Sequence, residues 1–305
     1  MANTSETRLA YVAESTWGTT PATPAFQISR FTGEGLTPSI NTTTSEELRQ
    51  DRNITDLIQT GQTAGGNVDF ELSFGAIDDL LESVLYSTWV SDVIKNGVTE
   101  KSFTLEKTFE TGSTDQFHRL AGSVADTLSL DLQVGNVATG SFGFLSKGLD
   151  AAQTQITGAT YTAAPSNDVI STASGFGSLA ITGATNAMLT QLQIEISNNL
   201  AHQQQLGSLD ARGIRSGRFE VSGSLTAYFE SKELYDLFLS GSAADLSFKL
   251  GGTSAKNYVF DIPNLKFSDG SVVAGGNDQD LLVNLSFTGL YDANDDATIK
   301  ITRTV

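Results

Sequence analysis

Histidines and glycine-rich segments are the first places to look for chemistry in this sequence. The two histidines, His118 and His202, are far apart, and neither belongs to an H-E-x-x-H pattern, in which two imidazoles one helical turn apart bind zinc. The sequence contains no G-x-S-x-G nucleophile elbow and no G-x-x-x-x-G-K-[ST] phosphate loop. We therefore expect neither histidine to be catalytic or to bind a metal.

A second candidate for chemistry is an acidic segment near the end of the chain. Asp292, Asn294 and Asp296 have the D-x-N-x-D spacing that can wrap a calcium ion. An EF-hand loop also needs glycine at its sixth position and glutamate at its twelfth, and this sequence has Ala297 and Arg303 there. The segment is more typical of a surface turn, and we predict no catalytic residue, no metal site and no cofactor.

Composition narrows the class of protein further. The 305 residues include 35 acidic and 18 basic side chains, a formal charge of −17, and this excess disfavours binding to nucleic acid or anionic membrane. The chain has no cysteine, as expected for assembly in a reducing cytoplasm. It has no run of about 18 apolar residues and no apolar segment near Met1, so we expect neither a membrane span nor a signal peptide.

The hydrophobic pattern changes period at two corresponding places. Residues 67–74 alternate apolar and polar side chains, which predicts a half-buried strand, and residues 76–88 then show the spacing of an amphipathic helix. About 150 residues later, the strand pattern returns at 217–225 and the helix pattern at 231–240. A strand leading directly into a helix therefore occurs twice.

Further predicted strands flank these two units in matching order. Residues 36–40 precede the first unit and 192–196 the second, and further alternating strands are expected at 103–109, 127–134, 141–145, 258–267 and 281–290. Residues 148–183, rich in Ala, Thr, Ser and Gly, are expected to form a connector that adds short strands. The alternative is that two β-rich halves resemble each other by chance.

These patterns predict a mainly β protein made of two modules, residues 1–150 and 151–305, each with one packed α-helix and related by internal duplication. The predicted core comes from the apolar faces of the strands. It consists of Phe70, Leu72, Phe74, Leu130, Leu132, Phe219, Val221, Val283, Leu285 and Phe287.

Several short segments with recognisable sequences follow one another along the chain. Residues 11–21 read Y-V-A-E-S-T-W-G-T-T-P. In the second half come L-Q-I-E-I-S-N-N-L at 192–200, L-G-S at 206–208, G-S-L-T-A-Y-F at 223–229 and F-D-I-P at 260–263. In sequence and in order these segments resemble the tail tube proteins of long-tailed phages with non-contractile tails, in the family whose chains carry two copies of the tube fold. The resemblance covers most of the chain.

The resemblance implies a tail-tube module of β-sandwich or barrel type, whose sheet joins those of its neighbours around a wide lumen, with the helix outside. Six modules per ring would make each ring a trimer with pseudo-sixfold symmetry. The polar strand faces would line the lumen, and an acidic lining would leave DNA free to slide. The candidate lumen residues are Asp69, Glu71, Asp131, Glu195 and Glu220. The long segments 41–65 and 198–216 would reach other subunits or rings, and their candidate contact residues are Arg49, Asp51, Arg52, Gln204, Arg212 and Arg215.

The resemblance also implies a location and partners. The protein would assemble in the host cytoplasm and become part of the virion tail, as a structural protein and not an enzyme. Its partners would be itself, in stacked rings, and the tape-measure, distal-tail and tail-terminator proteins, with DNA passing through without specific binding. Two alternatives are another tail component, such as a terminator or decoration protein, and a secreted β-rich adhesin or carbohydrate-binding protein.

Overall fold

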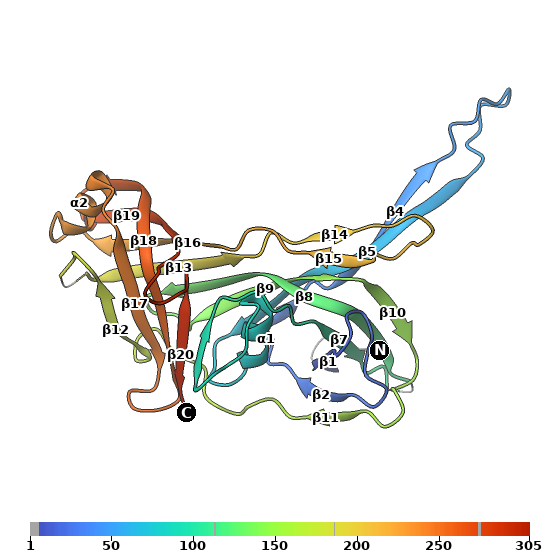
Figure 1. The fold of residues 1–305 in the computed structure, drawn as a ribbon, viewed down its shortest axis with the longest axis horizontal. Helices are drawn as coiled ribbons and strands as arrows, with labels where there is room; N and C mark the ends of the chain where they lie inside the picture. Colours follow the sequence, from blue (N-terminus) through green and yellow to red (C-terminus); the bar gives the residue numbers. More distant parts are fainter. Residues whose placement is uncertain (1–5, 113, 186, 274–275) are drawn as a thin grey trace.

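A computed structural model describes residues 6–112, 114–185, 187–273 and 276–305, and Figure 1 shows the fold. The start of the segment considered above for a signal peptide, residues 1–5, lies outside the described residues. The elements up to residue 152 are β1 (Thr7–Ala13), β2 (Ala25–Ile28), β3 (Gly33–Glu34), β4 (Thr37–Thr44), β5 (Leu57–Glu71), α1 (Asp78–Val84), β6 (Val93–Lys95), β7 (Phe103–Phe109), β8 (Gln116–Gln133), β9 (Thr139–Ser146) and β10 (Gly148–Ala152). Those that follow are β11 (Thr160–Thr162), β12 (Phe176–Ile181), β13 (Leu189–Ser197), β14 (Ala201–Gln203), β15 (Gly213–Arg215), β16 (Glu220–Tyr228), α2 (Glu233–Ser240), β17 (Ala244–Gly251), β18 (Asn257–Val273), β19 (Leu282–Gly289) and β20 (Lys300–Thr304).

One antiparallel sheet runs through both halves of the chain. Its central strands follow the order β5–β9–β8–β13–β16–β19–β18, so the halves meet where β8 pairs with β13. The pairing at this junction is unbroken from Gln191 opposite Gln133 to Ser197 opposite Thr127. The mainly β class predicted from the sequence is confirmed.

Two long strands, β8 and β18, each serve two sets of neighbours. The first part of β8 pairs with β7 and β10, and its last part lies between β9 and β13. The first part of β18 likewise pairs with β17 and β20, and its last part, residues 265–273, pairs with β19. Among the described residues, the other edge of 266–273 has no strand beside it.

The pairing pattern of the first half recurs in the second. β5 leads to α1 and pairs with β9, which pairs with β8; β16 leads to α2 and pairs with β19, which pairs with β18. The outer pairs also match, since β1–β7, β7–β8 and β8–β10 correspond to β12–β17, β17–β18 and β18–β20. Each half therefore has the same arrangement of strands around one helix.

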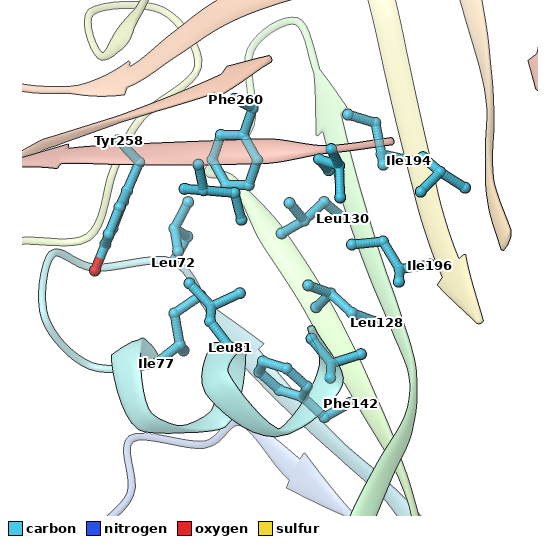
Figure 2. Close-up of a cluster of buried hydrophobic side chains, with 14 of the residues drawn as sticks. Leu72, Ile77, Leu81, Leu128, Leu130, Phe142, Ile194, Ile196, Tyr258 and Phe260 are labelled. Atoms are coloured by element: carbon cyan, nitrogen blue, oxygen red, sulfur yellow. The ribbon is translucent and has the colours of Figure 1, made fainter. Parts of the chain in front are cut away.

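The apolar faces of these strands form one core that extends across both halves. Figure 2 shows Leu72 and Leu81 of the first half in one cluster of buried side chains with Ile194 and Phe260 of the second. Strand alternation makes this possible, because each residue that points inward is followed by one that points away from the core. Of the ten predicted core residues, nine are buried; Phe219 is half-buried, because it precedes β16 at the margin of the sheet.

Both predicted helices exist but are shorter than expected. In α1, Leu80, Leu81 and Val84 are buried, and the acidic side chains of the first turn face the positive end of the helix dipole. In α2, the chain turns out of the helix at Gly241, whose φ of 60° is a left-handed conformation that glycine adopts without strain.

Residues 148–183, the predicted connector, contain three strands that pair with strands of both halves. β10 pairs with β8, β11 runs parallel to β2, and β12 pairs with β17. A cut at residue 150 would fall inside β10. In addition, the C-terminal strand β20 pairs with β6 of the first half. The division at residue 150 remains a prediction about domains.

Candidate assembly surfaces

The polar face of the central sheet carries the predicted lumen residues. Residues directly opposite each other on antiparallel strands point to the same face. Glu195 on β13 lies opposite Ser129 on β8 and Ser222 on β16, while Asp131 lies opposite Gln193 and Thr139. The structure therefore brings these two carboxylates from different halves onto one surface.

The remaining candidates lie on the same face toward its margins. On β5, Asp69 lies opposite Ser141 and Glu71 opposite Thr139. Glu220 lies opposite Ser197 at the beginning of β16. The reverse face of these strands carries the buried core side chains, so this polar face points away from the core. The residues opposite these carboxylates on β8, β9, β13 and β16 are serine, threonine and glutamine.

Local contacts determine how much charge the polar face presents. Ser141 donates a hydrogen bond from Oγ to Asp69 Oδ1 at 2.5 Å, and Gln191 donates one from Nε2 to Asp131 Oδ1 at 3.4 Å. Arg218 donates from Nε to Glu220 Oε1 at 2.7 Å, and this bond lowers the pKa of Glu220 below its usual value. Glu220 is thus ionised but neutralised by its neighbour.

Two charged residues of this face were missed in the sequence. Lys266 lies opposite Thr288, and Asp269 lies opposite Ser286. A β-bulge between Phe267 and Asp269 inserts one residue and interrupts the alternation, so counting by twos places Asp269 on the wrong face. A bulge leaves little trace in the hydrophobic pattern of a single strand.

The predicted segment 41–65 forms most of a long hairpin, which we call the arm (β4, the tip 45–56 and the first part of β5). It projects beyond the rest of the molecule at the right of Figure 1. Arg49, Asp51 and Arg52 lie at its tip, where Arg49 and Asp51 form an exposed ion pair at 2.9 Å. Hydrogen bonds from Arg49 and Asn53 lower the pKa of Asp51 to about 2, so the pair is ionised in neutral solution.

The predicted segment 198–216 forms a second hairpin, β14–β15, which lies on the first half of its own chain. Leu209 O accepts a hydrogen bond from the backbone N–H of Gln62 at 2.8 Å, and His202 Nε2 lies 2.9 Å from Ser146 O. The predicted contact residues Gln204, Arg212 and Arg215 have exposed side chains on this hairpin.

The opening motif of the sequence has a structural role that sequence reasoning did not assign. Glu14 Oε2 accepts hydrogen bonds from the Gly18 N–H and the Ser102 hydroxyl, and Oε1 accepts them from Thr104 and the Gly122 N–H, all at 2.8 Å. One carboxylate therefore fixes the turn that contains Trp17 against β7 and β8.

The acidic segment near the C-terminus is a surface turn, as predicted. The backbone N–H groups of Asn294 and Asp295 donate to Asp292 Oδ1 at 2.8 and 2.9 Å. In the part of the chain that the structure describes, no group of histidine, aspartate and glutamate side chains is arranged to hold a metal. The helices of the same part are too short and polar to cross a membrane.

These observations define a β-structured protein in which one polar face of the central sheet is shared by two similar halves. A family model described as phage tail tube protein matches residues 4–289. The chain belongs to the phage tail tube protein family, and the predicted resemblance is confirmed at that level. It is therefore a structural protein of the virion tail. A comparison with curated proteins finds no match.

Proposed function

We propose that this protein polymerises as stacked rings into the tail tube of a long-tailed phage with a non-contractile tail, and that the tube conducts the genome into the host. The observation that carries the proposal is the continuous polar face of the central sheet. A wall for a water-filled channel needs one polar face over an extended sheet and an apolar core behind it. The chain has both.

Ring closure would use the two edges of the central sheet. At one edge, residues 266–273 of β18 have no further strand beside them among the described residues, and at the other, β3 pairs with β5 alone. Exposed edges of this kind would promote aggregation in a monomer and are removed when copies close into a barrel. We infer that the β18 edge of one copy pairs with the β3 edge of the next.

The recurring strand arrangement supports two copies of the tube module in each chain. If a ring holds six modules, three chains complete it, with pseudo-sixfold symmetry. Asp69, Glu71, Asp131 and Glu195 would then repeat around the lumen and repel DNA phosphates, so that the genome slides without being held. Tape-measure, distal-tail and tail-terminator proteins would contact the tube, and assembly would take place in the host cytoplasm.

Electron microscopy of the purified protein, combined with native mass spectrometry, tests the proposal. Hollow tubes or rings of three chains are expected. A ring of six chains would contradict the stoichiometry, and a lumen lined by lysine and arginine would contradict the sliding argument. A protein that stays monomeric over a wide concentration range and forms no tube would contradict the proposed polymerisation.

A further inference from the structure

The arm and the β14–β15 hairpin occupy corresponding positions in the two halves. The arm connects β3 to the last part of β5, the strand before α1, and the β14–β15 hairpin connects β13 to β16, the strand before α2. Both hairpins extend toward the same side of the molecule in Figure 1. The arm therefore corresponds to a hairpin that packs on a surface of its own chain.

The surface that the β14–β15 hairpin packs on is an apolar patch of the first half. Leu200 and Ile214, at the base of the β14–β15 hairpin, pack with Tyr86, Val124 and Leu145. Two hydrogen bonds hold the hairpin there. The Leu200 N–H donates to the side-chain oxygen Oδ1 of Asp126 at 2.9 Å, and the Gln62 N–H donates to the carbonyl oxygen of Leu209 at 2.8 Å. The second half thus holds the first by laying a hairpin across it.

Beyond its base, where the Gln62 N–H is bonded to Leu209 O, the arm receives no such support from the described residues of its own chain. All eight residues of β4 are exposed, and the apolar side chains along the arm remain in water. Their exposed fractions are 57% for Ile40, 99% for Leu48, 73% for Ile54, 63% for Leu57 and 45% for Ile58. A series of exposed apolar side chains on one element marks a surface that another molecule covers.

Strand register identifies the surface of the second half that corresponds to this apolar patch of the first half. Phe142 on β9 lies opposite Leu128 on β8, and Phe287 on β19 lies opposite Phe267 on β18. Counting three residues on from each phenylalanine makes Leu290 the counterpart of Leu145. Leu290 and its neighbour Tyr291 are 37% and 59% exposed.

The same counting assigns the part of the arm that would meet this surface. Thr37 lies opposite Gly65, which also lies opposite Leu145. In the second half, Ser197 lies opposite Glu220. The β16–β19 register ends at Ser222 opposite Thr288, and continuing it by two residues places Glu220 opposite Leu290. Thr37 therefore corresponds to Ser197, and three residues on, Ile40 corresponds to Leu200.

We propose that the arm of one copy lies across Leu290 and Tyr291 of the neighbouring copy in the same ring, with Ile40 in the place that Leu200 takes within the chain. The direction fits, because the β14–β15 hairpin crosses from the second half onto the first, and the arm leaves the first half at the edge where the second half of the next copy would continue the sheet. This inference rests on the proposed ring and names the surface that joins its members.

The absence of cysteine from the natural sequence makes a clean cross-linking test possible. Ile40→Cys combined with Leu290→Cys places one thiol on the arm and one on its proposed docking surface. A disulfide needs Cβ atoms about 3.5–4.5 Å apart, so it forms at contact and not at a distance. Thr42→Cys with Tyr291→Cys, the counterparts of His202 and Ser146, gives an independent second pair.

The matched control is Ser39→Cys with Leu290→Cys. Ser39 is the neighbour of Ile40 on the same strand, but its side chain points to the opposite face. Rings are first verified by electron microscopy under reducing conditions, so that a failure of assembly is separated from a failure of docking. The tubes are then oxidised and run on denaturing gels without reductant.

The expected result is a covalent trimer as the largest product of both test pairs, with little cross-linking of the control. An open ladder of products beyond the trimer would show that the arm reaches another ring and would overturn the same-ring placement. Rings that form but cross-link no better in the test pairs than in the control would overturn the docking surface and leave the proposed function standing.

Discussion

Glu14 joins three separate segments of the first half through one carboxylate with four donors. Glu14→Gln replaces one acceptor oxygen by an amide that cannot accept, so at least one of the donors loses its partner. Hydrogen bonds to a charged group contribute about 1.5–3 kcal/mol each, and we expect a loss of about 2–4 kcal/mol in the free energy of unfolding. Urea unfolding measures it. The control Glu110→Gln, on an exposed side chain, should change little; equal effects of the two would contradict the role of Glu14.

Asp126 should make stability depend on pH at the junction of the halves. Burial raises the pKa of its carboxyl, against the opposing effect of the hydrogen bond from the Leu200 N–H. The folded chain therefore keeps this proton to higher pH than the unfolded chain. Its favourable contribution is complete below the unfolded pKa of about 4 and is lost as pH rises through the raised folded pKa.

Asp126→Asn removes this titration and keeps an acceptor for Leu200. The free energy of unfolding of the variant relative to wild type should thus rise between about pH 3 and about pH 7. Urea unfolding of both proteins at a series of pH values measures the difference, in which the other carboxyls cancel. A difference that falls with pH, or stays constant, would contradict the sign of the pKa shift.

Sequence reasoning placed individual residues well where alternation was regular. It put Asp69, Asp131 and Glu195 on one polar face, because a strand reverses its side chains at every residue. It missed Asp269, beyond a bulge, and Glu14, whose four partners come from segments up to 108 residues away. Contacts of that range depend on tertiary structure, which local spacing does not record.

At the scale of elements, the two hairpins should differ in their sensitivity to protease. Trypsin cleaves after arginine. The arm presents Arg49 and Arg52 on an exposed tip, whereas Arg212 and Arg215 lie on a hairpin packed against the first half. Cleavage requires local unfolding, which costs least where few contacts hold the chain.

We therefore expect cleavage at the arm to be at least about tenfold faster than at the β14–β15 hairpin in the unassembled protein, since the packed hairpin must first open at a cost of more than about 1.4 kcal/mol. Mass spectrometry of timed digests identifies the sites. Assembled tubes should lose the fast cleavage. Equal rates at the two hairpins, or a fast rate that persists in tubes, would contradict the view that assembly covers the arm.

The sequence predicted the helices and strands that have a clear hydrophobic period. It did not predict which strands pair with one another. The strand-to-helix units were found because the period changes from two to 3.6 within a few residues. The sequence did not predict that β8 continues through 18 residues into a second set of neighbours, or that β20 pairs with β6. The alternation of side chains in a strand shows which of its faces is buried. Pairing between strands uses backbone hydrogen bonds, which almost every residue type can form, so the sequence does not show which strands pair.

For the whole molecule, the charge of the polar face should decide whether tubes retain DNA. Asp131→Lys with Glu195→Lys changes the charge of each chain by four units near the middle of the sheet. If this face lines the lumen, tubes of the variant should bind DNA at low salt and release it steeply as salt rises, because bound phosphates displace counterions. Wild-type tubes should bind little. Fluorescence anisotropy of labelled single-stranded DNA in the presence of tubes measures this.

The matched control is Glu230→Lys with Asp278→Lys, which makes the same change in net charge outside the strands of the central sheet. DNA binding by the control equal to that of the test variant would show that net charge alone is responsible. Failure of the test variant to bind DNA while its tubes remain intact would place the polar face away from the channel.

The pairing of β8 with β13 and of β6 with β20 has a consequence for how the chain melts. The two halves share a sheet and a core, so unfolding of either half exposes apolar surface of the other. Neither half is therefore stable once the other has unfolded. Calorimetry should record one heat-absorption peak, with equal calorimetric and van't Hoff enthalpies; two resolved peaks would mean that the halves melt separately. A genetic screen for temperature-sensitive tails would accordingly recover core substitutions from both halves, with a single shared phenotype.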